Sequence, residues 1–194
     1  MNLPVRNTSF VVRALGACIV APVLFSACSS MGGGAPIAAT FSQQSLPAGV
    51  QVPAGNKVAL ETVGIGEITY ECRDKANAAG QTEWVFVGPN AVLNDRSGKK
   101  IGMYYGPPAT WEAMDGSKLT GTQVAVAPSG TGNLPFQLVK ANPAVGIGAM
   151  SGVTFIQRVA LVGGVAPASS CESSTKGQKS IVKYQADYVF WKAS

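Results

Sequence analysis

The stretch "IVKYQADYVFW", residues 181–191, shows the periodicity that decides the fold. Apolar or aromatic side chains occupy every second position, and mostly polar side chains stand between them. The apolar set is Val182, Tyr184, Ala186, Tyr188 and Phe190. Because successive side chains of a strand point to opposite faces, this pattern predicts a long β-strand with one buried face.

The same alternation continues outward from this stretch. "ITYEC" (68–72) and "VTFIQRVALV" (153–162) read as strands, the second with Gln157 and Arg158 near its middle. Shorter strand-like runs occur at 57–63, 83–87, 91–94, 99–104, 119–126 and 135–140. Turn sequences separate them: "GPN", "DRSG", "DGS" and "PSGTGN". Since helical periodicity is nearly absent, we expect an all-β, single-domain antiparallel β-sandwich or barrel.

The N-terminal region has a different character. Residues 1–27 combine basic residues, an apolar run from 14 to 25 and small residues, which is the layout of a signal peptide. The apolar run is shorter than the roughly 20 residues of a membrane-spanning helix. Residues 28–55 are rich in Gly, Ala, Ser and Pro and predict a flexible linker. The β domain is therefore expected at 56–194.

Cys28 ends the sequence "FSAC", which resembles the lipobox of a bacterial lipoprotein. We expect Cys28 to carry a lipid that anchors the protein to a membrane of the cell envelope, at the outer membrane or cell surface. Phe25 stands where Leu is usual, so simple secretion or a periplasmic location is the alternative.

The charge gives no support for nucleic acid as a partner, and we expect none. Removing residues 1–27 takes away two of the 15 basic residues and none of the 10 acidic ones, which lowers the net charge from +5 to +3. The basic residues are also scattered, and Lys99 and Lys100 are the only adjacent pair. Nucleic-acid binding needs a concentrated basic surface.

Two cysteines remain for the folded domain once Cys18 leaves with the signal peptide and Cys28 is acylated. In an oxidising compartment Cys72 and Cys171 have one possible pairing, and we expect a disulfide. Metal ligation is the rival interpretation. Two thiols without any His and without a CxxC spacing make a poor metal site, so we predict no metal.

Several motifs together carry a family resemblance. They are "ITYEC" (68–72), Trp84, "GPNAVLNDRSGKKIG" (88–102), "TWEAMDGS" (110–117), "VTFIQRV" (153–159), "GGVAP" (163–167), Cys171 and "YQADYVF" (184–190). The combination resembles domain of unknown function 3455, a family of secreted bacterial and fungal proteins. The resemblance implies no settled function. The family commonly has a His where this chain has Tyr104.

Members of this family are often labelled malate dehydrogenase in genomes, and the sequence speaks against that label. A nicotinamide enzyme needs a Gly-rich turn between a strand and a helix. The nearest segment here, "GIGAMSG" (146–152), precedes an alternating strand. There is also no His to transfer a proton. We therefore predict no cofactor.

The absence of His also excludes Ser-His-Asp and Cys-His catalysis and leaves carboxylates as candidates. Glu112 and Asp115 lie in "MYYGPPATWEAMDGS" (103–117), close to Trp111, as a glycosidase pair could. The favoured alternative is a turn in which Asp115 hydrogen-bonds the backbone and Gly116 takes a positive φ.

The remaining candidates are aromatic or cationic. Tyr104, Tyr105 and Trp111 could form a platform for a sugar or another small ligand, or simply cap the core. Arg158 lies in an apolar strand and needs a partner. Glu112, Asp115 or Asp187 could supply the acid, and we expect Glu112 or Asp115 to pair with Arg158 and pin the loop; the alternative is an arginine that binds an anion.

We therefore expect a binding or interaction module for a small ligand or an envelope partner, and not an enzyme. The alternative is a carboxylate-dependent hydrolase acting on glycans. Two carboxylates in a cleft, one with a raised pKa, would favour the hydrolase. A turn with both carboxylates solvated would favour the binding module.

Overall fold

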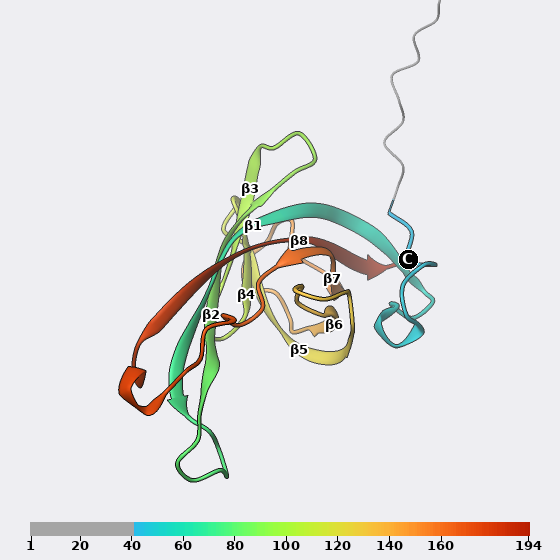
Figure 1. Cartoon of the computed structure of the whole chain (residues 1–194). Helices are drawn as coiled ribbons and strands as arrows, with labels where there is room; N and C mark the ends of the chain where they lie inside the picture. The colour runs from blue at the N-terminus through green and yellow to red at the C-terminus, as the bar shows by residue number, and fades with distance from the viewer. Residues whose placement is uncertain (1–40) are drawn as a thin grey trace, which may run out of the picture. The chain divides into compact units, whose positions relative to one another are not determined.

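Eight antiparallel strands follow one another around a closed barrel, and β1 pairs with β8 to close it (Figure 1). The computed structural model describes residues 41–194. The strands are β1 (Asn56–Asp74), β2 (Thr82–Asn94), β3 (Lys100–Tyr105), β4 (Thr110–Ala113), β5 (Lys118–Ala127), β6 (Phe136–Ala141), β7 (Val153–Gly163) and β8 (Lys179–Ala193). The all-β expectation is confirmed, and the architecture is a barrel.

Two expected breaks are absent because strands continue through them. The runs 57–63 and 68–72 are parts of β1, and "GPN" (88–90) lies inside β2 instead of forming a turn. Glycine permits both continuations. A Cβ on Gly66 would collide with the β2 backbone at Asn90, and one on Gly88 would collide with the carbonyl oxygen of Gly106. The other turn sequences do connect strands as expected.

The barrel interior holds the main hydrophobic core. The alternating residues of β8 point inward as predicted, and Tyr184, Ala186, Tyr188 and Phe190 are all buried. β1 contributes the next inner row, including Ile68. Because β1 and β8 pair along almost their whole length, these two strands form the longest ladder of the barrel (Figure 1).

Residues 41–55 pack on the outer face of the barrel, so the linker expectation for 28–55 is wrong over this part. The segment includes a 3-10 turn, η1 (Ala48–Val50), and Val50 is 1% exposed against Val189 and Trp191. Alternation in the sequence did not reveal it because only a few apolar side chains in this segment make the contact.

Gln157 fixes this segment to the barrel. Its side chain faces outward from β7 and is fully buried. Nε2 donates to the carbonyl of Val50 at 2.7 Å and to Oε1 of Gln43 at 2.9 Å, while Oε1 accepts from Nε1 of Trp191 at 2.9 Å. The polar residue in an apolar strand is therefore fully hydrogen-bonded, as buried amides require.

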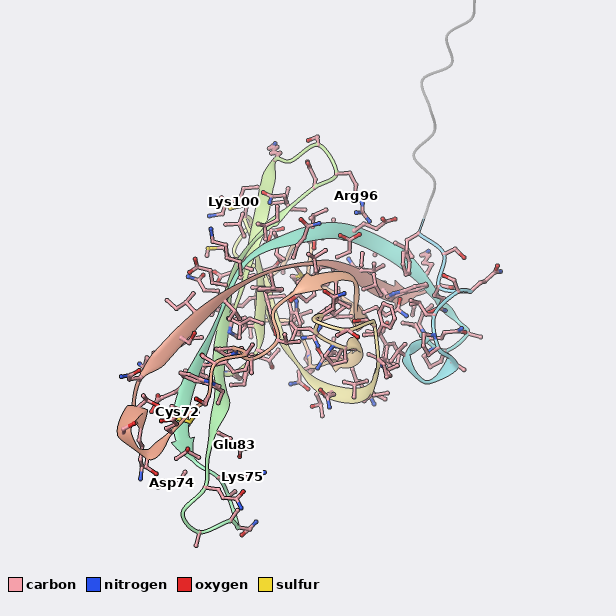
Figure 2. The ribbon with its side chains drawn as sticks, in the orientation of Figure 1. Cys72, Asp74, Lys75, Glu83, Arg96 and Lys100 are labelled. Carbon is pink, nitrogen blue, oxygen red and sulfur yellow. A yellow bond between two sulfur atoms is a disulfide. The ribbon has the colours of Figure 1, made fainter. Side chains whose placement is uncertain are left out.

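The disulfide between Cys72 and Cys171 is confirmed. It joins the end of β1 to the long β7–β8 connection, which contains a second 3-10 turn, η2 (Ser173–Thr175). Figure 2 shows Cys72 close to the end of the β1–β2 hairpin. The helical segments within residues 41–194 are single short turns, and none is long enough to span a membrane.

Candidate functional site

A row of cross-strand neighbours on the inner face places Arg158 inside the barrel. Val126 of β5 lies opposite Gln137 of β6, Gln137 lies opposite Arg158 of β7, and Arg158 lies opposite Tyr188 of β8. Arg158 follows the outward-facing Gln157, so alternation turns its side chain inward. It is half-buried.

Three tyrosines gather next to this arginine. The rings of Tyr104 and Tyr188 are 4.9 Å apart, and the hydroxyl groups of Tyr184 and Tyr188 are 3.1 Å apart. All three side chains are buried. We refer to Tyr104, Tyr184, Tyr188 and Arg158 as the tyrosine–arginine cluster.

Burial raises the pKa of all three phenols in the cluster. Removal from solvent is the main cause for Tyr104, Tyr184 and Tyr188, and the pKa of Tyr188 lies well above its ordinary value of 10.0. The positive charge of Arg158 acts in the opposite direction on each of them but does not prevail. The phenols are therefore neutral at physiological pH and do not neutralise the guanidinium.

The guanidinium of Arg158 bonds to a backbone carbonyl. Nε and Nη2 donate to the carbonyl oxygen of Pro135 at 3.3 and 3.0 Å. Within residues 41–194 it forms no ion pair with an acidic side chain. The expected pairing with Glu112 or Asp115 is therefore wrong.

The physical reason is the alternation of the strands themselves. Glu112 is adjacent to the inward-facing Trp111, and Asp187 is adjacent to the inward-facing Tyr188, so both acids point outward. Neither side chain can reach an arginine inside the barrel.

Glu112 and Tyr105 form a pair on the outer face. The Tyr105 hydroxyl donates to Oε2 of Glu112 at 2.6 Å, and this hydrogen bond is the main reason why the pKa of Tyr105 is raised. Tyr105 follows Tyr104 in β3 and therefore faces away from the cluster. These two candidates belong to the outer surface.

Asp115 caps the β4–β5 turn. Oδ1 accepts from the hydroxyl and the backbone N–H of Ser117, and Oδ2 accepts from the N–H of Ala149 at 2.7 Å. Gly116 has a φ of 83°. The Ser117 hydroxyl, followed by the Ala149 amide, lowers the pKa of Asp115. The turn interpretation of "MDGS" therefore describes this residue.

Trp111 lies inside the barrel beside the cluster. Its ring stacks on that of Tyr104 with centroids 4.7 Å apart, and it meets Tyr188 edge-on at 6.0 Å. The side chain is 1% exposed, and its Nε1 has no hydrogen-bond partner among the described residues. A buried N–H without an acceptor costs free energy, so this donor needs explanation.

Of the six residues proposed from sequence, the structure thus brings together Tyr104, Trp111 and Arg158. Sequence reasoning missed Tyr184 and Tyr188 as site residues, although it placed both on the buried face of β8. The missing information was register: only strand pairing shows that Tyr188 lies opposite Arg158.

The model of DUF3455, described as a protein of unknown function, matches residues 53–192. The chain belongs to this family. The match begins just before β1 and runs through β8 almost to its end, so the DUF3455 region coincides with the barrel. No curated protein and no solved structure matches the chain.

The glycine-rich segment of this DUF3455 chain, Gly146–Gly152, leads into β7 and not into a helix. Its backbone N–H groups bind side chains of the chain itself: Ala149 donates to Asp115, and Met150 donates to Ser117. These amides are not free to hold a pyrophosphate, as a dinucleotide site requires. Among residues 41–194 no group of three metal-binding side chains occurs.

Proposed function

We propose that the barrel is a binding module for a small ligand, held at the tyrosine–arginine cluster. The observation that carries this proposal is Arg158, a half-buried cation that faces inward without an acidic partner in residues 41–194. A buried charge with a purely structural role is normally paired with an opposite charge. Eight-stranded barrels have an interior wide enough for side chains or for one small ligand.

Solvent reaches the inner face beside Arg158. Ala125 and Ala127 of β5 pack toward the outer cluster of residues 41–55, so Val126 between them faces the interior side. Val126 is nevertheless 48% exposed. Exposure along this row falls from Val126 to the half-buried Gln137 and Arg158, and we take its exposed end as the approach to the guanidinium. We call the open end of this row the barrel mouth.

The hydrolase alternative has less support. A glycosidase acid needs a raised pKa, and Asp115 has a lowered one because Ser117 and Ala149 donate hydrogen bonds to it. Glu112 is engaged by Tyr105 on the outer face. Asp115 thus matches the turn that favours a binding module, whereas Glu112 lies half-buried in β4 with its carboxylate bonded to Tyr105.

We further propose that the protein is exported and anchored in the cell envelope through Cys28. The disulfide between Cys72 and Cys171 supports an oxidising compartment. Cys28 and the proposed signal peptide, residues 1–27, lie outside the described residues. In the native host, Cys28→Ser should move the protein from the membrane fraction to the soluble fraction. A wild-type protein that is already soluble would contradict the anchor.

The binding proposal is tested by blocking the barrel mouth with a larger side chain at Val126. A library of small charged and neutral compounds is screened for those that raise the melting temperature of the full-length protein, since a ligand that binds only the folded state stabilises it. Val126→Trp should abolish the response to the compounds found. The matched control is Val162→Trp, which adds the same side chain to a 62% exposed position on the outer face.

Val162 lines an apolar groove of about 430 Å³ on the outside of the barrel, together with Ile65 and with Tyr184 of the cluster. If Val162→Trp abolishes the response and Val126→Trp preserves it, the ligand binds in this groove and the proposal is wrong. It is equally wrong if no compound in the library stabilises the wild-type protein.

A further inference from the structure

The cluster and its surroundings offer hydrogen-bond donors and no carboxylate. The Tyr104 hydroxyl makes no hydrogen bond to the described part of the chain, and Trp111 Nε1 is likewise without a partner. In the Tyr184–Tyr188 pair one hydroxyl donates to the other, which leaves the second O–H free to donate. These groups suit a ligand that accepts hydrogen bonds.

The guanidinium adds one positive charge with part of its hydrogen-bonding capacity unused. Pro135 occupies Nε and one N–H of Nη2. The two N–H groups of Nη1 and the remaining N–H of Nη2 have no acceptor in the described chain. A planar oxyanion can accept hydrogen bonds from this side of the guanidinium. A cation would be repelled there.

From these observations we infer that the ligand is a small monocarboxylate with an apolar body, whose carboxylate binds Arg158 and the tyrosine hydroxyls; this inference rests on the proposed function. One guanidinium balances one negative charge. A phosphate dianion would leave a net charge in a half-buried site, where uncompensated charge is costly. Val126, which is 48% exposed, supplies apolar surface for the rest of the molecule.

The test uses isothermal titration of the full-length protein with benzoate and hexanoate. Their neutral isosteres, benzamide and hexanamide, and the dianion phenyl phosphate are titrated in parallel. We expect at least one carboxylate to bind, with its amide and phenyl phosphate at least tenfold weaker. Arg158→Gln should weaken carboxylate binding at least tenfold. Arg73→Gln, which removes an equal charge from the exposed pair with Glu71, should leave it unchanged.

A second variant keeps the inference testable if Arg158→Gln fails to fold. Tyr104→Phe removes a hydroxyl that has no partner in the described chain, so the melting temperature should stay the same while carboxylate affinity falls severalfold. Tyr70→Phe is the control, because the Tyr70 hydroxyl already donates to the carbonyl of Gly164 at 2.8 Å. It should leave the affinity unchanged.

The outcomes separate this inference from the proposed function. Amides that bind as tightly as the carboxylates, or phenyl phosphate that binds more tightly, would overturn the carboxylate preference and leave a small-ligand site at the mouth intact. Failure of both carboxylates to bind overturns the inference as well. The proposed function is then judged separately, by the library screen and the Val126→Trp variant.

Discussion

Arg96 is joined to Asp187 by a 2.7 Å hydrogen bond from Nη1 to Oδ2. Nη2 of the same guanidinium donates to Oε2 of Glu61, also at 2.7 Å. Glu61 in turn accepts from the backbone N–H of Phe41 at 3.1 Å. The β2–β3 loop, whose Arg96 is labelled in Figure 2, is thereby fastened to the outer faces of β1 and β8 and to the N-terminal segment.

We predict that Arg96→Gln lowers the free energy of unfolding by about 1 kcal/mol. The side chain of Arg96 is 48% exposed, so screening by solvent keeps the contribution of each ion pair small, and the network of two acids raises the total to this value. Urea unfolding measures the change. Arg73→Gln, which breaks an isolated surface pair with Glu71, should lower the free energy of unfolding by less than Arg96→Gln does. Equal losses in both variants would refute the network.

A larger effect is expected at Gln157. Gln157→Leu conserves the approximate size of the side chain but leaves the Val50 carbonyl and the Trp191 N–H without their partner. Because each unsatisfied buried group costs about 1–3 kcal/mol, we expect a loss of about 3 kcal/mol. Limited proteolysis should also cleave the 41–55 segment faster.

The exposed Gln185 of β8 provides the control for this experiment. Gln185→Leu makes the same chemical change on the same side of the sheet and should alter stability by less than about 0.5 kcal/mol. A Gln157→Leu variant as stable as the wild type would show that the N-terminal segment does not depend on this amide.

Most of the strand content was predictable because alternation is a local signal, whereas the four-residue β4 was too short to produce one. The inward direction of Tyr184 and Tyr188 could be derived from residues 181–191 alone. The neighbours of Arg158 could not, because strand register depends on pairing across the whole barrel. The aromatic residues around the acids of 103–117 suggested one of those acids as the partner, whereas alternation sends Glu112 outward.

The packing of residues 41–55 was unpredictable for a related reason. Val50 and Val52 are isolated apolar residues in a segment rich in Gly, Ala, Ser and Pro, so they produce no periodic signal. Their burial depends on an apolar outer face of the barrel around Val189 and Trp191. An outward-facing apolar patch on a strand can only be recognised once the strands are assembled.

The disulfide is expected to contribute substantially to stability. Cys72 and Cys171 are 99 residues apart, and closing a loop of this length is worth at most about 4.7 kcal/mol in the chain-entropy model. We predict that the double variant Cys72→Ala, Cys171→Ala loses about 2–4 kcal/mol in urea unfolding. Reducing the wild-type protein should lower stability by a similar amount. Peptide mapping without reductant that finds both thiols free would contradict the pairing.

Asp115 should make the protein less stable in acid. Its folded-state pKa is lowered, chiefly by the Ser117 hydroxyl, below the ordinary value of 3.8. The stabilisation is therefore present above the ordinary pKa and is lost as the pH falls through the folded-state pKa. Asp115→Asn should reduce the loss of stability between about pH 5 and pH 2, measured by urea unfolding at each pH.

The β2–β3 turn offers an independent repeat of the same test. Asp95 accepts from the hydroxyl and backbone N–H of Ser97, and the Ser97 hydroxyl is the main cause of its lowered pKa. Asp95→Asn should likewise reduce the loss of stability between about pH 5 and pH 2. The effects of Asp95→Asn and Asp115→Asn should be additive, since distant sites act independently. If the double variant loses as much stability in acid as the wild type, these two aspartates are not the cause of the acid sensitivity.

The last prediction separates a ligand-binding arginine from a structural one. If Arg158 formed a buried ion pair with Glu112 or Asp115, Arg158→Met would leave a carboxylate unpaired and cost about 3–5 kcal/mol. In the structure its protein partner is the Pro135 carbonyl, and the substitution also removes a half-buried charge that lacks an acid in residues 41–194. These effects oppose each other, so we expect a change of less than about 1.5 kcal/mol. A double-mutant cycle between Arg158→Met and Glu112→Gln should show no coupling, because Glu112 binds Tyr105 on the other face of the sheet. A loss of 3 kcal/mol or more would mean that Arg158 stabilises the barrel, and the argument that its charge is held ready for a ligand would fail.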